Sequence, residues 1–318
     1  MTRFLHGLGH ALFAGFMATA WSALALADLG RFSAWPCVVL GLLVALAVYY
    51  FARREMDNGH PPSQAETLAS GAAAIIAAGT LFLSLPPSEM VLGGWDPGVY
   101  MHTAAAVSRG GSLRIDDPDL ASLGPRERQV VARDLFGVVE PFGGMRVLPN
   151  GKTSPEFHHL YPSFLAVAYS AGGIRAAQAV NPLLCAVAVI LIFLLAKRML
   201  GSGAALMAAL LLAMNPAQVW QAGFSTAEPL TQVLLLGGLL YLGPALEGRS
   251  MLDAILCGAA FGLALLARYD TVLLLVPLTL VVIVAWQRPL STSHAQVAAG
   301  VFALVLLHLF LHQRYVAP

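Results

Sequence analysis

Residues 180–213 read VNPLLCAVAVILIFLLAKRMLGSGAALMAALLLA. Lys197 and Arg198 are the only charged residues in this stretch, and Gly201 follows them closely. A helix that crosses a lipid bilayer needs about 20 predominantly apolar residues. The stretch therefore predicts two membrane helices joined by a short turn just after the basic pair.

The composition of the whole chain has the same character. Of its 318 residues, 58% are hydrophobic and 11% are charged, and the mean hydropathy is +0.73. Soluble domains have about 25% charged residues. The net charge of +1 provides no basic field for nucleic acid, so no nucleic-acid partner is expected. The three cysteines each lie in an apolar run, which predicts neither a disulfide framework nor a Cys/His metal cluster.

Apolar segments recur along the chain and predict an all-α integral membrane fold, a polytopic bundle of about nine transmembrane helices. A polar loop, residues 87–158, separates the third span from the fourth. The apolar piece from Leu160 to Ala171 is too short to cross, so we expect a re-entrant or interfacial helix there. The expected spans are approximately residues 9–28, 35–52, 68–86, 176–196, 202–218, 229–246, 251–267, 271–287 and 294–312.

Basic residues predict the orientation, because cytoplasmic connections carry an excess of Lys and Arg. With a cytoplasmic N-terminus, seven basic residues lie inside and four lie in the short outer connections. This predicts a multi-pass protein of the cell (inner or plasma) membrane, with loop 87–158 and any active site on the extracytoplasmic side. The inner set is Arg3, Arg53, Arg54, Lys197, Arg198, Arg249 and Arg288, and the outer set is Arg31, Arg175, Arg268 and Arg314.

The loop opens with WDPGVY at residues 95–100. Asp96 before Pro97 is typical of a helix N-cap, which predicts a short surface helix with Val99 and Val107 facing lipid. Asp96 also fits a catalytic base, because burial against the bundle would raise the pKa of its carboxyl group. Both interpretations of Asp96 stay open, and Tyr100 lies beside either one.

Two polar motifs lie near later helices. In HHLYP, residues 158–162, adjacent histidines on a helix point in different directions, so we expect a single histidine to contact substrate or lipid, or to be structural. In STAEPL, residues 225–230, Ser225 and Glu228 fit a capping box, which stays open beside a substrate-binding role for Glu228.

Charged residues interrupt the apolar run near residue 268. A charge at membrane depth costs about 2.5–3.5 kcal/mol on insertion scales, so Arg268 and Asp270 mark either a helix–helix turn or a site. Arginine is well suited to bidentate phosphate contacts. An outward-facing Arg268 suits the phosphate of a lipid-linked donor, and a plain helix–helix turn stays open beside this role.

Acidic residues cluster at 116–119, where Asp116, Asp117 and Asp119 surround Pro118. Hard cations prefer oxygen ligands, which leaves a divalent metal open as a cofactor, although the proline favours a solvated turn. The mixed charges of residues 124–134 predict an exposed amphipathic helix.

The order of these motifs, WDPGVY, HHLYP, Asn181-Pro182, the Ser225–Leu230 turn and the Arg268-Tyr-Asp segment, resembles the GT-C-fold polyprenyl-phosphate-sugar-dependent glycosyltransferases. The groups it is similar to are the protein O-mannosyltransferases and the lipid A aminoarabinose transferases. The resemblance covers about residues 68 to 290. It implies a helical membrane bundle whose large first extracytoplasmic loop bears surface helices.

The resemblance also implies roles for individual residues. Asp96 matches the family's catalytic base, Arg268 its donor-phosphate ligand, and Glu228 an acidic position of the same cavity. His159, Tyr161, Tyr100 and Asp270 are expected to contact substrate. The implied partners are a polyprenyl-phosphate-linked sugar donor, a glycan, lipid or protein acceptor, and membrane lipid.

The resemblance divides the chain into three parts. Residues 1–66 are expected to form an appendage of two transmembrane helices, residues 67–290 a GT-C-like membrane module, and residues 291–318 a final span. Family members usually continue beyond such a span, which leads us to expect a truncated or reduced form. A transporter or flippase for a lipid-linked or amphipathic solute, and a non-catalytic relative, remain as alternatives to a transferase.

Overall fold

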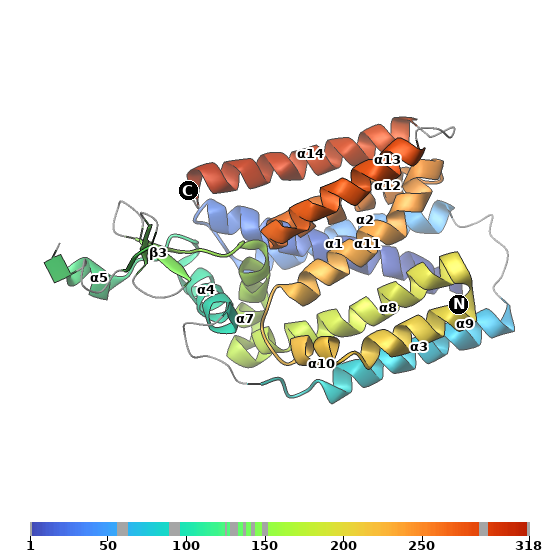
Figure 1. Ribbon diagram of the computed structural model, residues 1–318, viewed down its shortest axis with the longest axis horizontal. Helices are drawn as coiled ribbons and strands as arrows, with labels where there is room; N and C mark the ends of the chain where they lie inside the picture. Colours follow the sequence, from blue (N-terminus) through green and yellow to red (C-terminus); the bar gives the residue numbers. More distant parts are fainter. Residues whose placement is uncertain are drawn as a thin grey trace.

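A computed structural model describes residues 2–55, 63–88, 96–124, 126–127, 133–135, 138–140, 144–147, 152–285 and 292–316. Most of its helices run roughly along one long axis, and two others lie at one end of this bundle (Figure 1). The bundle helices are α1 (Thr2–Asp28), α2 (Ala34–Glu55), α3 (Gln64–Leu83), α8 (Val180–Leu200), α9 (Ser202–Ala213), α11 (Glu228–Glu247), α12 (Met251–Ala267), α13 (Leu275–Ala285) and α14 (Thr292–Tyr315).

The described helices confirm an all-helical membrane architecture. Six of them are long and apolar enough to cross a bilayer, and the bent pair α9 and α10 (Pro216–Ala222) would make seven. Helix α12 and the segment Tyr269–Leu280 are apolar but shorter, so the expected number of nine spans stays a prediction. The six spans are Gly7–Asp28, Ala34–Arg53, Gln64–Leu83, Val180–Leu200, Glu228–Glu247 and Ser293–Tyr315.

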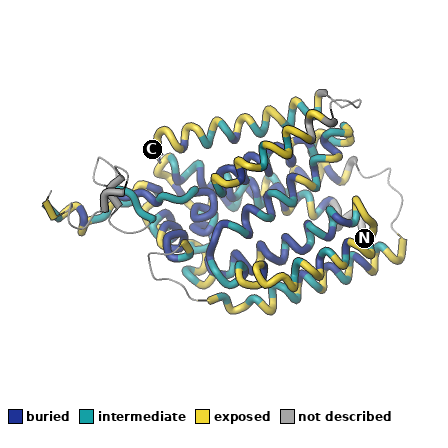
Figure 2. Tube along the Cα trace, in the orientation of Figure 1, coloured by how far each residue is buried: buried dark blue, intermediate teal, exposed yellow. Residues whose placement is uncertain are grey.

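Large apolar side chains cover the outside of the bundle as well as its core. Figure 2 shows exposed positions along the outer faces of the peripheral helices, and Phe82, Leu200 and Leu273 are among the exposed hydrophobic residues. In water such a surface would drive association. In a bilayer it is the surface that faces lipid.

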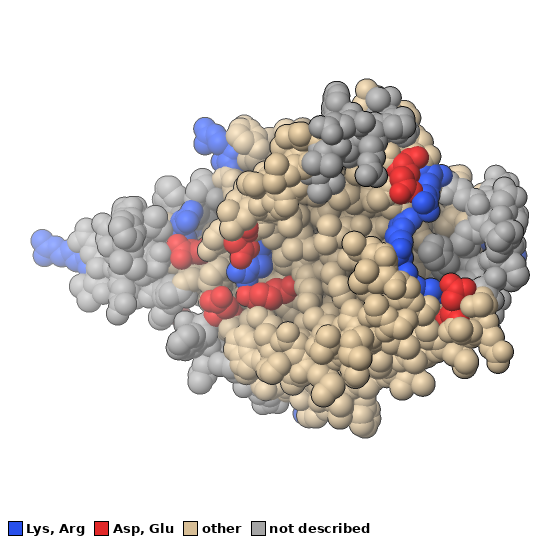
Figure 3. All heavy atoms as spheres, turned by 45° about the vertical axis from the view of Figure 1, so that its right-hand side comes forward, with Lys and Arg blue, Asp and Glu red and all other residues tan. Residues whose placement is uncertain are grey.

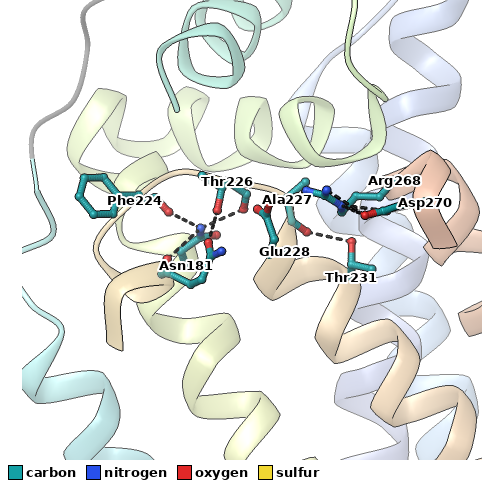
Figure 4. A network of polar contacts seen from close by, with 9 residues as sticks. Asn181, Phe224, Thr226, Ala227, Glu228, Thr231, Arg268 and Asp270 are labelled. Carbon is teal, nitrogen blue, oxygen red and sulfur yellow. Dashed lines mark hydrogen bonds and ion pairs between the residues drawn. The ribbon is translucent and has the colours of Figure 1, made fainter. Parts of the chain in front are cut away.

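The two helices at the end of the bundle are α4 (Asp96–Gly110) and α7 (Leu160–Gln178), which pack against each other. Helix α7 crosses over the ends of the bundle helices, as an interfacial helix would (Figure 4). It continues past the expected Ala171 after a break at Gly172 and Gly173, where Gly173 has φ +65°. A left-handed φ of this kind is easily adopted only by glycine.

Helix α4 is more enclosed than a surface helix. Val99 and Val107, which were expected to face lipid, are instead buried in the protein. Their burial in protein follows from the packing of α4 on α7. The apolar face of α4 was predicted correctly, but it packs against protein and not against lipid.

Short elements complete the loop. Helix α5 (Pro118–Ser122) precedes two antiparallel hairpins, β1 (Arg133–Leu135) with β2 (Val138–Glu140) and β3 (Met145–Val147) with β4 (Thr153–Pro155). The hairpins were not expected. Most of the amphipathic helix expected at 124–134 lies outside the described residues, and its last two positions belong to β1.

Small residues bring α12 and α14 close together. A Cβ atom at Gly262 would lie 2.7 Å from the Cβ of Val305, so only glycine fits this crossing. Close packing through small residues is common between membrane helices. The C-terminal end of α14 lies at the same end of the bundle as α4 and α7 (Figure 1).

Charged residues separate to the two ends of the bundle. Figure 3 shows two groups of charged side chains divided by a largely uncharged surface. At one end Lys197 pairs with Glu66 at 3.4 Å, and Arg249 pairs with Glu247. At the other end Arg268 follows α12. The chain termini also lie at opposite ends (Figure 1), as the expected topology requires, although which end faces the cytoplasm stays a prediction.

Candidate functional site

Arg268 lies between two carboxylates where α11 and α12 meet. Helix α12 ends before Arg268, whose extended backbone (φ −151°, ψ 137°) turns the chain into the 3-10 helix η2 (Tyr269–Leu274). Its Nη2 donates to Asp270 at 2.9 Å and its Nε donates to the same carboxylate at 3.0 Å. Its Nη1 donates to Glu228, the first residue of α11 (Figure 4). The structure thus brings together three of the residues expected in the site.

The charges in this cluster are strongly coupled. Hydrogen bonding to Asp270 raises the pKa of Arg268, and the guanidinium in turn holds the pKa of the Asp270 carboxyl group below its ordinary value. Arg268 and Asp270 are therefore both ionised at neutral pH. The second carboxylate oxygen of Glu228 is buried and has no hydrogen-bond partner among the described residues.

Asn181, near the start of α8, fixes the loop that leads into α11. Its Oδ1 accepts from the Tyr161 hydroxyl at 2.9 Å, and its Nδ2 donates to the carbonyls of Thr226, at 3.0 Å, and Phe224 (Figure 4). These bonds hold the loop whose next residues are Ala227 and Glu228. Asn181 was recognised as part of a motif in the sequence, but its role in placing Glu228 was not foreseen.

The expected capping box at Ser225 and Glu228 is wrong. The N-cap of α11 is Ala227, and no side chain caps this helix end. Because Glu228 is bonded to Arg268, its side chain is directed across to the end of α12 instead of back to the helix start. The local pattern could not reveal this, since the competing partner lies 40 residues away.

Tyr100 connects α4 to the cluster. Its ring lies 5.1 Å from that of Tyr161, at 90°, and 5.3 Å from that of Phe157. Burial raises the pKa of Tyr100, and the nearby Glu228 carboxylate adds to this effect. The phenol is therefore a neutral hydrogen-bond donor at physiological pH, within electrostatic range of the cluster.

Asp96 lies four residues before Tyr100 and so on the same face of α4. It is the first residue of the helix, one position later than an N-cap, and it is exposed. The burial expected for this carboxylate is therefore wrong. After burial of the phenol, the charges of Glu228 and Asp96 also raise the pKa of Tyr100, and the charge of Arg268 lowers it.

His159 and His158 point in different directions, as expected for adjacent residues. His159 is buried, and its Nε2 donates to the carbonyl of Pro155 at 2.9 Å while its Nδ1 contacts Nε2 of His312 at 2.8 Å. Burial lowers the pKa of His159 to about 3. With both nitrogens occupied, His159 is a structural residue in this arrangement. The ring of His158 instead faces Tyr269 at 5.4 Å.

A buried network beyond His159 was missed in the sequence. Asp28, at the end of α1, accepts from Nε2 of His308 at 2.9 Å and contacts Nδ1 of His312 at 2.8 Å. Trp21 donates to the other nitrogen of His308 at 2.7 Å. Two histidines four residues apart in an apolar helix were the only local signal of this network.

Two carboxylates of the acidic cluster at 116–119 bond to groups within the loop. Asp117 caps α5 by accepting from the backbone of Leu120 at 2.9 Å, and Asp116 pairs with Lys152 at 2.9 Å. In place of the expected turn, the cluster begins the short helix α5. Within the described ranges, no group of three or more His, Cys, Asp or Glu side chains is arranged to hold a metal ion.

Comparison with known families gives one match. Residues 162–311 match the model of a family described as dolichyl-phosphate-mannose-protein mannosyltransferase, which is of the GT-C type. This confirms the resemblance for a segment that contains Glu228, Arg268 and Asp270 but not Asp96, Tyr100, His159 or Tyr161. Neither the curated proteins nor the solved structures contain a match to the chain.

Proposed function

Since residues 162–311 match this GT-C mannosyltransferase family, we propose that the chain moves a sugar from a polyprenyl-phosphate donor to an acceptor hydroxyl. The acceptor is a glycan, lipid or protein on the extracytoplasmic face. The observation that carries the proposal is the cluster of Arg268, Glu228 and Asp270. It lies inside the matched segment, where membrane helices end beneath α4 and α7.

In this proposal the donor phosphate binds the edge of Arg268 that now holds Asp270. The Asp270 carboxylate contacts Nε and Nη2 together, and a phosphate makes the same two-pronged contact. The side chain of Asp270 is 49% exposed, so it can turn away into solvent. Arg268 then stabilises the charge that develops on the leaving phosphate.

Asp96 is proposed to remove the proton from the acceptor hydroxyl as its oxygen attacks the anomeric carbon. A single displacement of this kind inverts the anomeric configuration. The phosphate leaves without needing a proton, so a second carboxylate acting as an acid is unnecessary. Tyr100, neutral and beside the cluster, is placed to donate a hydrogen bond to the donor.

Two substitutions in the cluster test the phosphate site in opposite directions. Arg268→Lys should weaken binding of polyprenyl phosphate, because a single ammonium cannot reproduce the fork of the guanidinium. Asp270→Asn should strengthen it about five-fold, roughly 1 kcal/mol, because a competing negative charge is removed. Binding to the purified protein in detergent would be measured for both variants.

Matched controls come from other parts of the chain. Arg198→Lys alters an arginine that donates to the Leu240 carbonyl at the opposite end, and Asp116→Asn removes an exposed carboxylate from the loop. Both should bind as the parent does. Parent-like binding by Arg268→Lys would contradict the phosphate site. A parent that carries the donor across the membrane intact, without cleaving it, would instead establish the flippase alternative.

A further inference from the structure

A polar cavity lies beside the Arg268 cluster and is separate from it. Its volume is about 420 Å³, within the ~300–1,000 Å³ range of small-molecule sites. Its walls are Arg146 of β3, the segment from Ser154 to His159, Tyr269, and the end of α14 at Leu309, His312 and Gln313. Tyr269 directly follows Arg268 in the chain, so the cavity adjoins the proposed phosphate site.

One polar group in the cavity wall is left without a partner. The hydroxyl of Ser154 is buried, with the residue only 1% exposed, yet it makes no hydrogen bond to any described residue. Leaving a buried hydroxyl unpaired costs about 1–3 kcal/mol. A ligand with hydroxyl groups of its own would satisfy it.

The three histidines at the cavity shape its wall. Burial lowers the pKa of His158, and its ring is held by the backbone of Leu265 and Leu266. His159 and His312 bond to each other and to Pro155 and Asp28. The polar group at the end of α14 that remains exposed is the amide of Gln313.

Tyr269 supplies a flat apolar surface at the cavity. Tyr269 is 68% exposed, so its ring is open to a ligand. A pyranose ring has an apolar face of C–H groups and a rim of hydroxyl groups. The apolar face matches an aromatic ring, and the hydroxyl rim matches Ser154 Oγ and the amide of Gln313.

We propose that this cavity binds a pyranose ring, with one face on Tyr269 and its hydroxyl groups on Ser154 and Gln313. Binding of a pyranose ring does not depend on the proposed transferase function. Only the identity of the molecule that carries the ring rests on that function. The ring is either the sugar of the lipid-linked donor or a sugar of a glycan acceptor. Both present the same chemistry to the cavity.

Binding of free methyl α-mannopyranoside and methyl β-glucopyranoside tests the site without any transfer reaction. Saturation-transfer NMR on the purified full chain should show binding of at least one of them. Tyr269→Ala should weaken it at least ten-fold, whereas Tyr269→Phe, which keeps the ring, should bind like the parent. Tyr50→Ala removes an exposed tyrosine of α2 and should have no effect.

Ser154→Ala provides a variant that should fold in any case, because its hydroxyl has no partner to lose among the described residues. It should weaken glycoside binding several-fold and should not lower the melting temperature, because an unpaired buried hydroxyl is removed. The proposal is overturned if neither glycoside binds the parent. Parent-like binding by both Tyr269→Ala and Ser154→Ala would overturn it equally.

Competition then identifies the source of the ring. If the cavity holds the donor sugar, polyprenyl-phosphate mannose should displace the glycoside and polyprenyl phosphate without sugar should not. If the cavity holds an acceptor sugar, neither lipid should displace it. Failure of both lipids to bind the protein at all would count against the transferase proposal, while glycoside binding and its loss in the variants would still establish the cavity.

Discussion

At Asp96, helix capping and general-base catalysis require different properties of one carboxylate. A cap needs only an oxygen that accepts a hydrogen bond, which asparagine also provides. A base needs a group that takes a proton, which asparagine lacks. Asp96→Asn should therefore fold and melt like the parent, bind polyprenyl-phosphate sugar, and transfer it about 10²–10⁴-fold more slowly. The rate of donor loss in membranes supplied with acceptor would measure the effect.

Normal turnover by this variant would move the search for the base to Glu228. That residue has a buried carboxylate oxygen without a partner in the described structure, whereas Asp96 is exposed at the start of α4. Glu228→Gln would then be compared with Asp96→Asn under the same conditions. A proton acceptor is lost in each, so only the true base should show the slow transfer.

The sequence predicted the members of the site better than their contacts. Arg268 and Asp270 stood out because charge is rare in an apolar run, and the structure places them in one cluster with Glu228. Their mutual bonding was not visible, because nothing local shows that a guanidinium will meet a carboxylate from a helix 40 positions earlier. The same limit hid Asp28, whose partners lie 280 and 284 positions away.

Among the elements, the loop between α10 and α11 depends on one side chain of α8. Asn181→Ala would remove the acceptor of the Tyr161 hydroxyl and the donor to the carbonyls of Phe224 and Thr226. The expected cost is about 1–3 kcal/mol, from buried groups left unpaired. The rate of sugar transfer should decrease by a larger factor than the fraction of folded protein does, because Glu228 is no longer held against Arg268.

Asn215→Ala is the matched control for this prediction. Asn215 caps α10 with a bond to the backbone of Ala217 at 2.9 Å and is exposed. Its loss should lower the melting temperature slightly and leave the kcat for transfer unchanged. If Asn181→Ala lost only as much activity as the control at equal folded fraction, Asn181 would have no positioning role.

The helices themselves were predicted well because a membrane span is recognisable from its length and its apolar composition. Each expected span overlaps a described helix, although 202–218 is bent between α9 and α10, and 271–287 begins in η2. The capping box that does form, Ser63 with Glu66 at the start of α3, is of the ordinary local kind. The hairpins at 133–140 and 145–155 were missed because each strand has only three residues. Strands this short have no detectable alternation of polar and apolar side chains.

For the whole molecule, the orientation in the membrane is the prediction on which an extracytoplasmic active site depends. Single cysteines placed at Ser122 and Lys152 should react with an impermeant thiol reagent added to intact cells. A cysteine at Asn58 should react only after permeabilisation. The native Cys37, Cys185 and Cys257 are all buried, so the background should be low. The opposite pattern would place the Arg268 cluster in the cytoplasm.

The network around Asp28 joins the first and last membrane helices, α1 and α14, and its hydrogen bonds can be counted. An indole N–H only donates and a peptide carbonyl only accepts. Trp21 therefore makes His308 donate to Asp28. At the other end the Pro155 carbonyl makes His159 donate from Nε2 and accept from His312.

One proton is then left to be shared between His312 and Asp28, since His312 already donates toward His159 and still contacts the carboxylate. Asp28→Asn supplies that hydrogen from a neutral amide, so every bond is kept without any charge. Its melting temperature should match the parent's, whereas Asp28→Ala should cost about 1–3 kcal/mol for each partner left unpaired. Equal loss in both variants would contradict the count. The C-terminal ends of α1 and α14 are thus joined through one shared hydrogen, which the amide of asparagine can supply as well as a carboxylic acid.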